Sequence, residues 1–235
     1  MSLFDAEHLV KLARIQDARR RVSLSGIGEQ VDEFIRGLEA DPVSLRVMQA
    51  LSLWTLGFGR DPNVQSKNFR AYWEGIPEVP GSLVVDDELE FVSLADPRPG
   101  LLRSCKMLGI QFEELGFSEE SAEPFNQNFP LPAEPFWFRH DDGRKNHKRR
   151  PDDCRDELVG DVLAGTALEG VFAYAHHPTI VVENEHSIDL PRTVLRDSRM
   201  NCAFLEVWRG QVRISLYRES DIASPGCGTL RLRRK

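Results

Sequence analysis

The segment at residues 124–138 limits the possible folds more than any other part of the chain. It holds four prolines among five aromatic residues. Proline lacks a backbone N–H and its ring clashes with a preceding helical turn, so this density forbids a helix and favours an extended chain. Aromatic side chains gain most when they are buried. The sequence therefore predicts an extended segment that is packed onto the protein and is not a free linker.

The first sixty residues carry helical patterns. An amphipathic pattern starts near Ser2 or Asp5, and a second one covers residues 31–38, where apolar residues recur at helical spacing. Asp41-Pro42 supplies an N-cap and a proline at the first helical position, and Gly57 is a suitable end for that third helix. These patterns predict a cluster of three short helices.

Strand patterns dominate the C-terminal part. Residues 203–208 and 211–217 alternate in polarity around Arg209-Gly210, which predicts a hairpin with a tight turn. A third strand is expected at 229–233, after a glycine-rich bend. Together these patterns predict an antiparallel sheet.

The middle of the chain is mixed. Short strands are expected within 82–94 and at 179–183, and helices are expected to begin at Pro99-Gly100 and at Pro151. The second of these helices is expected to bury Leu158, Val162, Leu163 and Leu168.

The expected fold class is therefore α+β, with an N-terminal helical cluster and a mixed domain that ends in an antiparallel sheet. The boundaries expected are 1–60 for the helical subdomain and 74–235 for the α+β domain, with one continuous domain as the alternative.

Composition favours an ordinary soluble protein of the cytoplasm. Hydrophobic residues make up 41% of the chain and charged residues 29%, and no window reaches the ~18 apolar residues that a transmembrane helix needs. The acidic N-terminal residues fit neither a secretory signal nor a transit peptide. The four cysteines form no CxxC pair, which favours reduced thiols. No motif predicts a cofactor or assigns the chain to a known family, and the oligomeric state is left open.

A cationic block stands out in this acidic chain. Residues 139–150, called the basic loop below, carry six Lys/Arg and two Asp, a charge of +4 within a chain of net charge −7. Such a block is typical of a contact with an anionic partner, either nucleic acid or an acidic protein. The alternative is a solvated loop that is neutralised by the acidic residues at 151–186. The candidate anion-binding residues here are Arg144, Lys145, Lys148, Arg149 and Arg150.

The C-terminal strands offer a second basic surface. If the leucines and isoleucine of these strands face the core, then Arg213, Arg231 and Arg233 face outward. Outward arginines could contact a polyanion, although they are also what the solvent face of a half-buried sheet ordinarily carries.

Three histidines lie close together in the sequence: His176, His177 and His186, with Glu183 and Glu185 nearby. They allow an alternative function, a hydrolase in which His176 or His177 acts with Glu183 and His186. The HExxH and HxH spacings of metal sites are missing, and adjacent histidines rarely point the same way, so no metal site is predicted. The leading hypothesis is a non-catalytic binding or adaptor protein, and the chain's status as an enzyme and any catalytic residues stay open.

The missing ligand spacing generates the first testable prediction. Metal analysis of protein purified without a histidine tag should find well under one equivalent of Zn, Mn, Fe or Ni. A stoichiometric metal that disappears in the His186→Ala variant would contradict it.

Overall fold

The computed structural model describes residues 41–84, 88–112, 130–195 and 198–234. These residues form helices and two sheets, and the helices are concentrated in the N-terminal half, so the expected α+β class is confirmed. Two of the predicted N-terminal helices, near residues 2–16 and 31–38, lie outside the described residues. No helix in the described part has the length and apolar character to cross a membrane.

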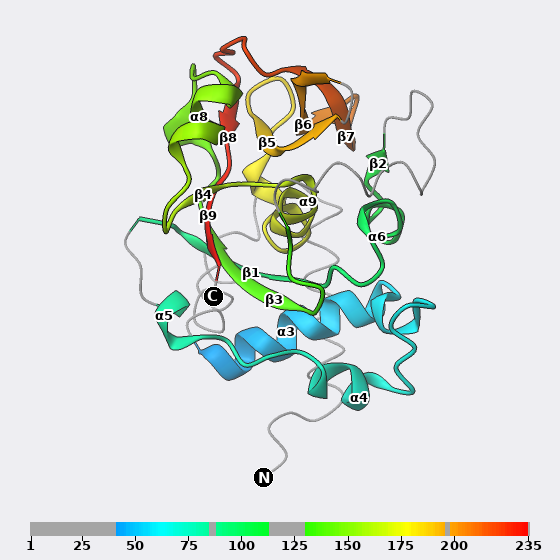
Figure 1. Ribbon diagram of the computed structural model, residues 1–235. Coiled ribbons are helices and arrows are strands. Elements are labelled where there is room, and N and C mark those ends of the chain that lie inside the picture. Colours follow the sequence, from blue (N-terminus) through cyan, green and yellow to red (C-terminus); the bar gives the residue numbers. More distant parts are fainter. Residues whose placement is uncertain (1–40, 85–87, 113–129, 196–197, 235) are drawn as a thin grey trace, which may run out of the picture. The chain divides into compact units, whose positions relative to one another are not determined.

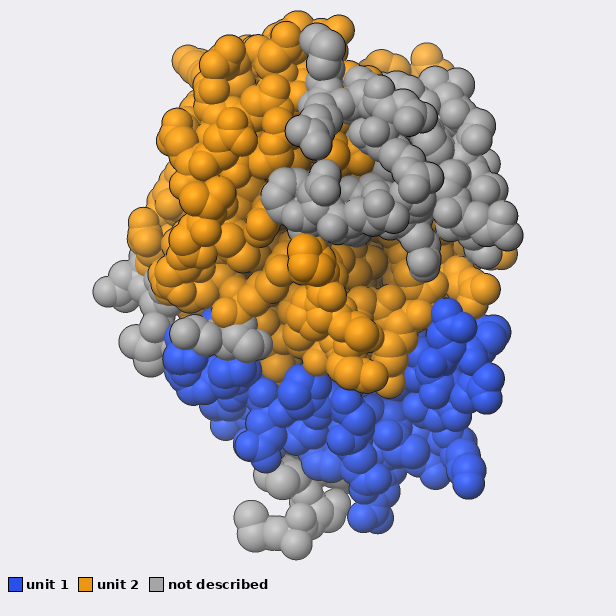
Figure 2. Space-filling model, viewed as in Figure 1, with its two compact units in different colours: residues 1–85 blue, residues 86–235 orange. Residues whose placement is uncertain are grey.

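The chain divides into two compact units, residues 1–85 and residues 86–235 (Figure 2). The described part of the first unit contains only helices, α3 (Pro42–Thr55), η1 (Phe58–Arg60), α4 (Phe69–Glu74) and α5 (Gly81–Val84). The expected boundaries at residues 60 and 74 stay a prediction.

Local capping explains where α3 begins and ends. The Asp41 carboxylate accepts a hydrogen bond of 2.9 Å from Ser44 N, and Pro42 occupies the first turn, as expected. Leu45 and Leu53 are buried along the helix. After the helix, Gly57 takes a φ of 104°, a left-handed conformation that favours glycine and redirects the chain.

The second unit contains two sheets (Figure 1). The first has the order β1-β3-β9-β4, formed by β1 (Phe91–Ala95), β3 (Phe136–His140), β9 (Arg231–Arg234) and β4 (Leu163–Ala164). The second has the order β2-β7-β6-β5-β8, formed by β2 (Gln111–Phe112), β7 (Gln211–Glu219), β6 (Ser198–Trp208), β5 (Ser187–Leu195) and β8 (Cys227–Thr229). The helical elements are α6 (Leu101–Leu108), η3 (Arg144–Asn146), α8 (Pro151–Glu157), α9 (Ala167–His176) and η4 (Pro178–Ile180).

The C-terminal strands differ from the expectation in one respect. The β6–β7 hairpin is confirmed, and its turn residues Arg209 and Gly210 both have positive φ, 52° and 73°. The expected strand at 229–233 is instead interrupted at Leu230. Its first part pairs parallel to β5 in one sheet, and its second part lies between β3 and β4 in the other. The sequence cannot show this change of sheet, because both parts alternate in polarity.

Two predictions for the middle of the chain were wrong in part. The predicted strand at 179–183 does not form. Its first two residues belong to the short helix η4, which Pro178 starts, and of the rest only Val182 makes a bridge, to His186. Within 82–94, residues 82–84 belong to the helix α5, and the strand β1 begins only at Phe91.

The helix that begins at Pro151 ends at Glu157, before the apolar residues expected on it. A separate helix, α9, follows because Thr166 and Glu169 form a capping box, in which each side chain accepts from the other residue's backbone N–H. Leu168 belongs to this second helix and Leu163 to β4. Nearly all of α9 is buried, including Val171 and Phe172.

The described end of the proline-rich segment agrees with the expectation of a packed, extended chain. Residues 136–138 are the first part of β3. They pair with β1 in antiparallel register and are buried, with Trp137 fully inaccessible. The part of this segment before residue 130 lies outside the described residues.

Burial of Trp137 generates a prediction about stability. Replacing it with Ala should lower the free energy of unfolding by about 3–5 kcal/mol, because the change leaves a large cavity in the first sheet. Thermal unfolding followed by circular dichroism would measure this loss. Trp208→Ala is the matched control, since that side chain is 49% exposed and its loss should change the melting temperature little. Equal effects of the two variants would contradict a buried role for Trp137.

Candidate functional site

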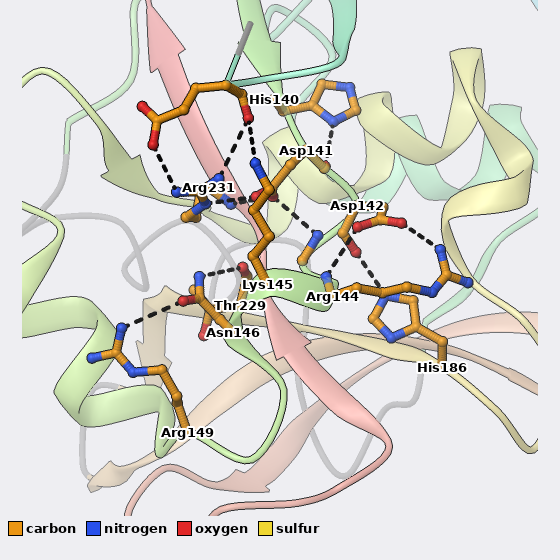
Figure 3. A network of polar contacts seen from close by, with 12 residues as sticks. His140, Asp141, Asp142, Arg144, Lys145, Asn146, Arg149, His186, Thr229 and Arg231 are labelled. Atoms are coloured by element: carbon orange, nitrogen blue, oxygen red, sulfur yellow. Dashed lines mark hydrogen bonds and ion pairs between the residues drawn. The ribbon is translucent and has the colours of Figure 1, made fainter.

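The basic loop leaves the end of β3 and is fixed to the C-terminal strands by Asp141. The Oδ1 atom of this buried carboxylate accepts from Gly143 N and Arg231 N, each at 3.0 Å, and Oδ2 accepts from Arg231 Nε at 2.6 Å (Figure 3). The Arg231 side chain is only 13% exposed, so this is a largely buried ion pair. One candidate C-terminal arginine is thus part of the loop's own support.

Two glycines allow the loop to approach β8 closely. A Cβ added to Gly228 would lie 2.2 Å from the Gly143 carbonyl oxygen, and Gly143 itself has a φ of 83°. Next to this contact, Asn146 Nδ2 donates to Thr229 O at 3.1 Å (Figure 3). The backbone of the loop is therefore held in one position against the strand.

Three arginines of the loop are paired with carboxylates close to them in the sequence. Arg144 pairs with Asp142, Arg149 with Glu157, and Arg150 with Asp153, to which it donates two hydrogen bonds of 2.7 and 2.8 Å. Two of the acids belong to α8. This pattern agrees with the alternative expectation of a loop neutralised by the acidic helix that follows it. The arginine side chains remain 35–54% exposed, so solvent weakens each pair.

The remaining cations of the loop lie in different surroundings. Lys145 Nζ donates to the Glu88 carbonyl oxygen at 3.1 Å. Lys148 has a φ of 62° and is fixed through its backbone, which donates to Ser224 O at 3.2 Å. Within the described residues the Lys148 side chain has no ion-pair partner. Arg139 is buried and donates to Leu89 O.

The C-terminal arginines do not share one sheet, which corrects the expectation of a single outward face. Arg213 lies on β7 and pairs with Glu206 at 2.6 Å, whereas Arg231 and Arg233 lie on β9 in the other sheet. Arg233 pairs with Asp161 at 2.6 Å. Whether any of these arginines binds an anion stays a prediction.

The three histidines of the alternative hydrolase site contact separate partners. His176 Nε2 lies 3.0 Å from Leu94 O and His177 Nε2 lies 3.1 Å from Val92 O, both on β1. Glu183 accepts from Gly210 N at 3.1 Å, at the β6–β7 turn. His186 contacts His147 and the Asp142 carbonyl oxygen. These contacts give no support to a shared catalytic centre, and no group of three metal-ligating side chains occurs within the described ranges.

Sequence reasoning missed two histidines, His140 and His147. His140 is fully buried, and its Nε2 lies 2.9 Å from Ser93 Oγ while its Nδ1 lies 2.8 Å from Asp141 O. Because a carbonyl oxygen only accepts, Nδ1 carries the proton and Nε2 accepts from the serine hydroxyl. Forty-seven residues separate Ser93 from His140, so only the β1–β3 pairing brings them together.

The four cysteines are free thiols in this structure, and three of them, Cys105, Cys154 and Cys202, are buried. Burial raises the pKa of Cys105 to about 12 and raises the pKa of Cys154 and Cys227. A raised pKa disfavours the thiolate that nucleophilic chemistry requires.

The chain was compared with protein families, curated proteins and solved structures. No family, no curated protein and no solved structure matches the chain.

Burial of His140 generates a prediction about pH. Burial, with smaller effects of His177 and Arg139, lowers the pKa of His140 to about 3 in the folded protein. An unfolded histidine titrates near pH ~6.5, so below that pH the unfolded chain binds a proton that the folded chain excludes. The free energy of unfolding is therefore unaffected by the titration of His140 above pH ~6.5. Below that pH it falls by up to about 1.4 kcal/mol per pH unit, until the folded protein also binds the proton near pH ~3.

Two other buried groups titrate in the same range. The pKa of His186 is also lowered and acts in the same direction, whereas burial raises the pKa of Asp189 to about 6, which opposes the loss. Urea unfolding of wild type and His140→Gln between pH ~7.5 and ~4.5 separates these effects, because only the difference between the two profiles reports on His140. A His140→Gln profile as steep as that of wild type would contradict the prediction.

Proposed function

We propose that this chain is a non-catalytic binding or adaptor protein of the cytoplasm that contacts an anionic partner, nucleic acid or an acidic protein, through the basic loop. The observation that carries the proposal is the combination of a fixed loop backbone with exposed cationic side chains. Asp141, Asn146 and the Gly143–Gly228 contact fix the loop, while Lys148 and three half-exposed arginines extend from it. A pre-ordered loop loses little entropy when it binds.

The ion pairs of the loop are compatible with such a contact. Each exposed pair contributes only about 0–1 kcal/mol, so a phosphate or carboxylate of a partner can replace the internal acid at small cost. Arg150 supports this exchange best, because it is 54% exposed and its planar guanidinium already makes a two-point contact with the Asp153 carboxylate. Phosphate presents oxygens with the same geometry.

A cytoplasmic location is supported by the free cysteines, since thiols stay reduced there. The hydrolase alternative is not favoured by the contacts of His176, His177, His186 and Glu183, which go to separate partners.

The proposal predicts how binding depends on salt. Replacing Lys148, Arg149 and Arg150 with Ala should lower the slope of log K against log salt by up to ~2–3 for nucleic acid, since each neutralised phosphate contributes about 0.7–0.9. Fluorescence anisotropy with mixed RNA and DNA oligonucleotides, measured from about 50 mM salt upward, gives this slope.

The matched control removes the same charge elsewhere. Arg60, Lys67 and Arg70 are exposed residues of the first unit, and their triple Ala variant should leave the slope unchanged. Equal losses in both triple variants would indicate a general effect of net charge. Absence of wild-type binding at about 50 mM salt would exclude nucleic acid as the partner and leave the acidic protein to be tested by the same variants.

A further inference from the structure

Two histidine rings meet where the basic loop contacts the turn at residues 182–186. His147 Nε2 lies 2.7 Å from His186 Nδ1, and the ring centroids are 4.7 Å apart. On its other side, His186 Nε2 lies 2.6 Å from the Asp142 carbonyl oxygen, as Figure 3 shows. His186 is 2% exposed. The two rings therefore complete a chain of hydrogen bonds that starts and ends on the loop.

The Asp142 carbonyl determines which nitrogen carries each proton. A carbonyl oxygen only accepts, so His186 Nε2 must carry a hydrogen. In the neutral ring Nδ1 is then without a hydrogen and accepts from His147 Nε2–H. The remaining nitrogen, His147 Nδ1, takes no part in this chain of bonds.

The first and the second proton bound by the pair therefore affect the hydrogen bond between the rings differently. The pair can hold one proton with every hydrogen bond in place, because His147 Nδ1 lies outside the chain of bonds. A second proton must bind to His186 Nδ1, where it meets the N–H of His147. Two donors then face each other, the hydrogen bond is lost, and two cations repel at short distance.

The surroundings of His186 make the second proton difficult to accommodate. Burial is the largest effect that lowers the pKa of His186, Arg144 and His147 lower it further, and the Asp142 carbonyl and carboxylate raise it. On its other side the His147 ring lies close to the backbone of Gly228 in β8. A Cβ added to Gly228 would lie 2.9 Å from His147 Cδ2. The rings thus have little room to turn away from each other while the loop stays closed.

We propose that His147 and His186 form a pH-sensitive latch on the basic loop. Protonation of both rings breaks their hydrogen bond and loosens residues 142–148 from the turn at 182–186. The opening stays local, because Asp141 and Arg231 hold the base of the loop through a separate ion pair. The latch acts on the conformation of the loop with or without a bound partner.

Hydrogen exchange of the wild-type protein tests the latch directly. Protection of the amides at 143–149, corrected for the intrinsic rate, should fall about threefold to tenfold as the pH is lowered from ~7.5 to ~4, the effect of losing one hydrogen bond. The range extends well below pH ~6.5 because burial lowers the pKa of His186. Amides of β6 provide the internal reference for general acid destabilisation. Loop protection that changes only in parallel with β6 would overturn the proposal.

Two variants identify the titrating group. His186→Asn and His186→Gln each keep one donor and one acceptor but cannot be protonated, so their loop protection should no longer depend on pH in this range. His176→Gln is the control, because His176 lies on α9 and contacts Leu94 O, and it should behave as wild type. Wild-type pH dependence in the folded His186 variants would overturn the proposal.

A nitrogen NMR titration of the wild-type histidines keeps the test independent of the variants. At pH ~7.5 the His186 Nδ1 should carry no hydrogen, and its protonation should coincide with the loss of loop protection. Loop opening at a pH where His186 stays neutral would also overturn the latch.

Discussion

The buried ion pair between Asp141 and Arg231 joins the basic loop, the first sheet and the C-terminal strand β9. It joins the end of β3 to the start of β9, and the same carboxylate accepts from the backbone of both segments. Removing either partner from such a buried pair leaves an unpaired charge, which costs about 3–5 kcal/mol in proteins. The first sheet, the base of the basic loop and the path of the C-terminal chain all share this one interaction.

Local sequence signals predicted much of this fold. Asp41-Pro42, Gly57 and Arg209-Gly210 each act through their own backbone geometry, and the structure places a helix start, a helix end and a hairpin turn there. Features that depend on distant pairing could not be predicted. The division of 229–233 between two sheets and the contact of Ser93 with His140 arise only when strands far apart in the chain meet.

The candidate site shows the same contrast. The charge of residues 139–150 identified the loop, but it could not show that Arg231 supports this loop while Arg213 lies in the other sheet. The His147–His186 pair had no signal in the sequence, because thirty-nine residues separate the two rings. Charge counting finds a cationic segment, whereas the partner of each cation depends on the tertiary fold.

The placement of β9 between β3 and β4 has a consequence for the order of folding. Arg231, the partner of Asp141, lies 90 residues later in the chain. Until β9 is made, the β1–β3 pair and β4 are not joined in one sheet. During synthesis the β3 edge is exposed for the time needed to add those residues, which is about 5–18 s at about 5–20 residues per second, and the β4 edge for a shorter time. Such open edges can pair with other chains, so chaperone protection during translation would benefit this protein more than one built from neighbouring hairpins.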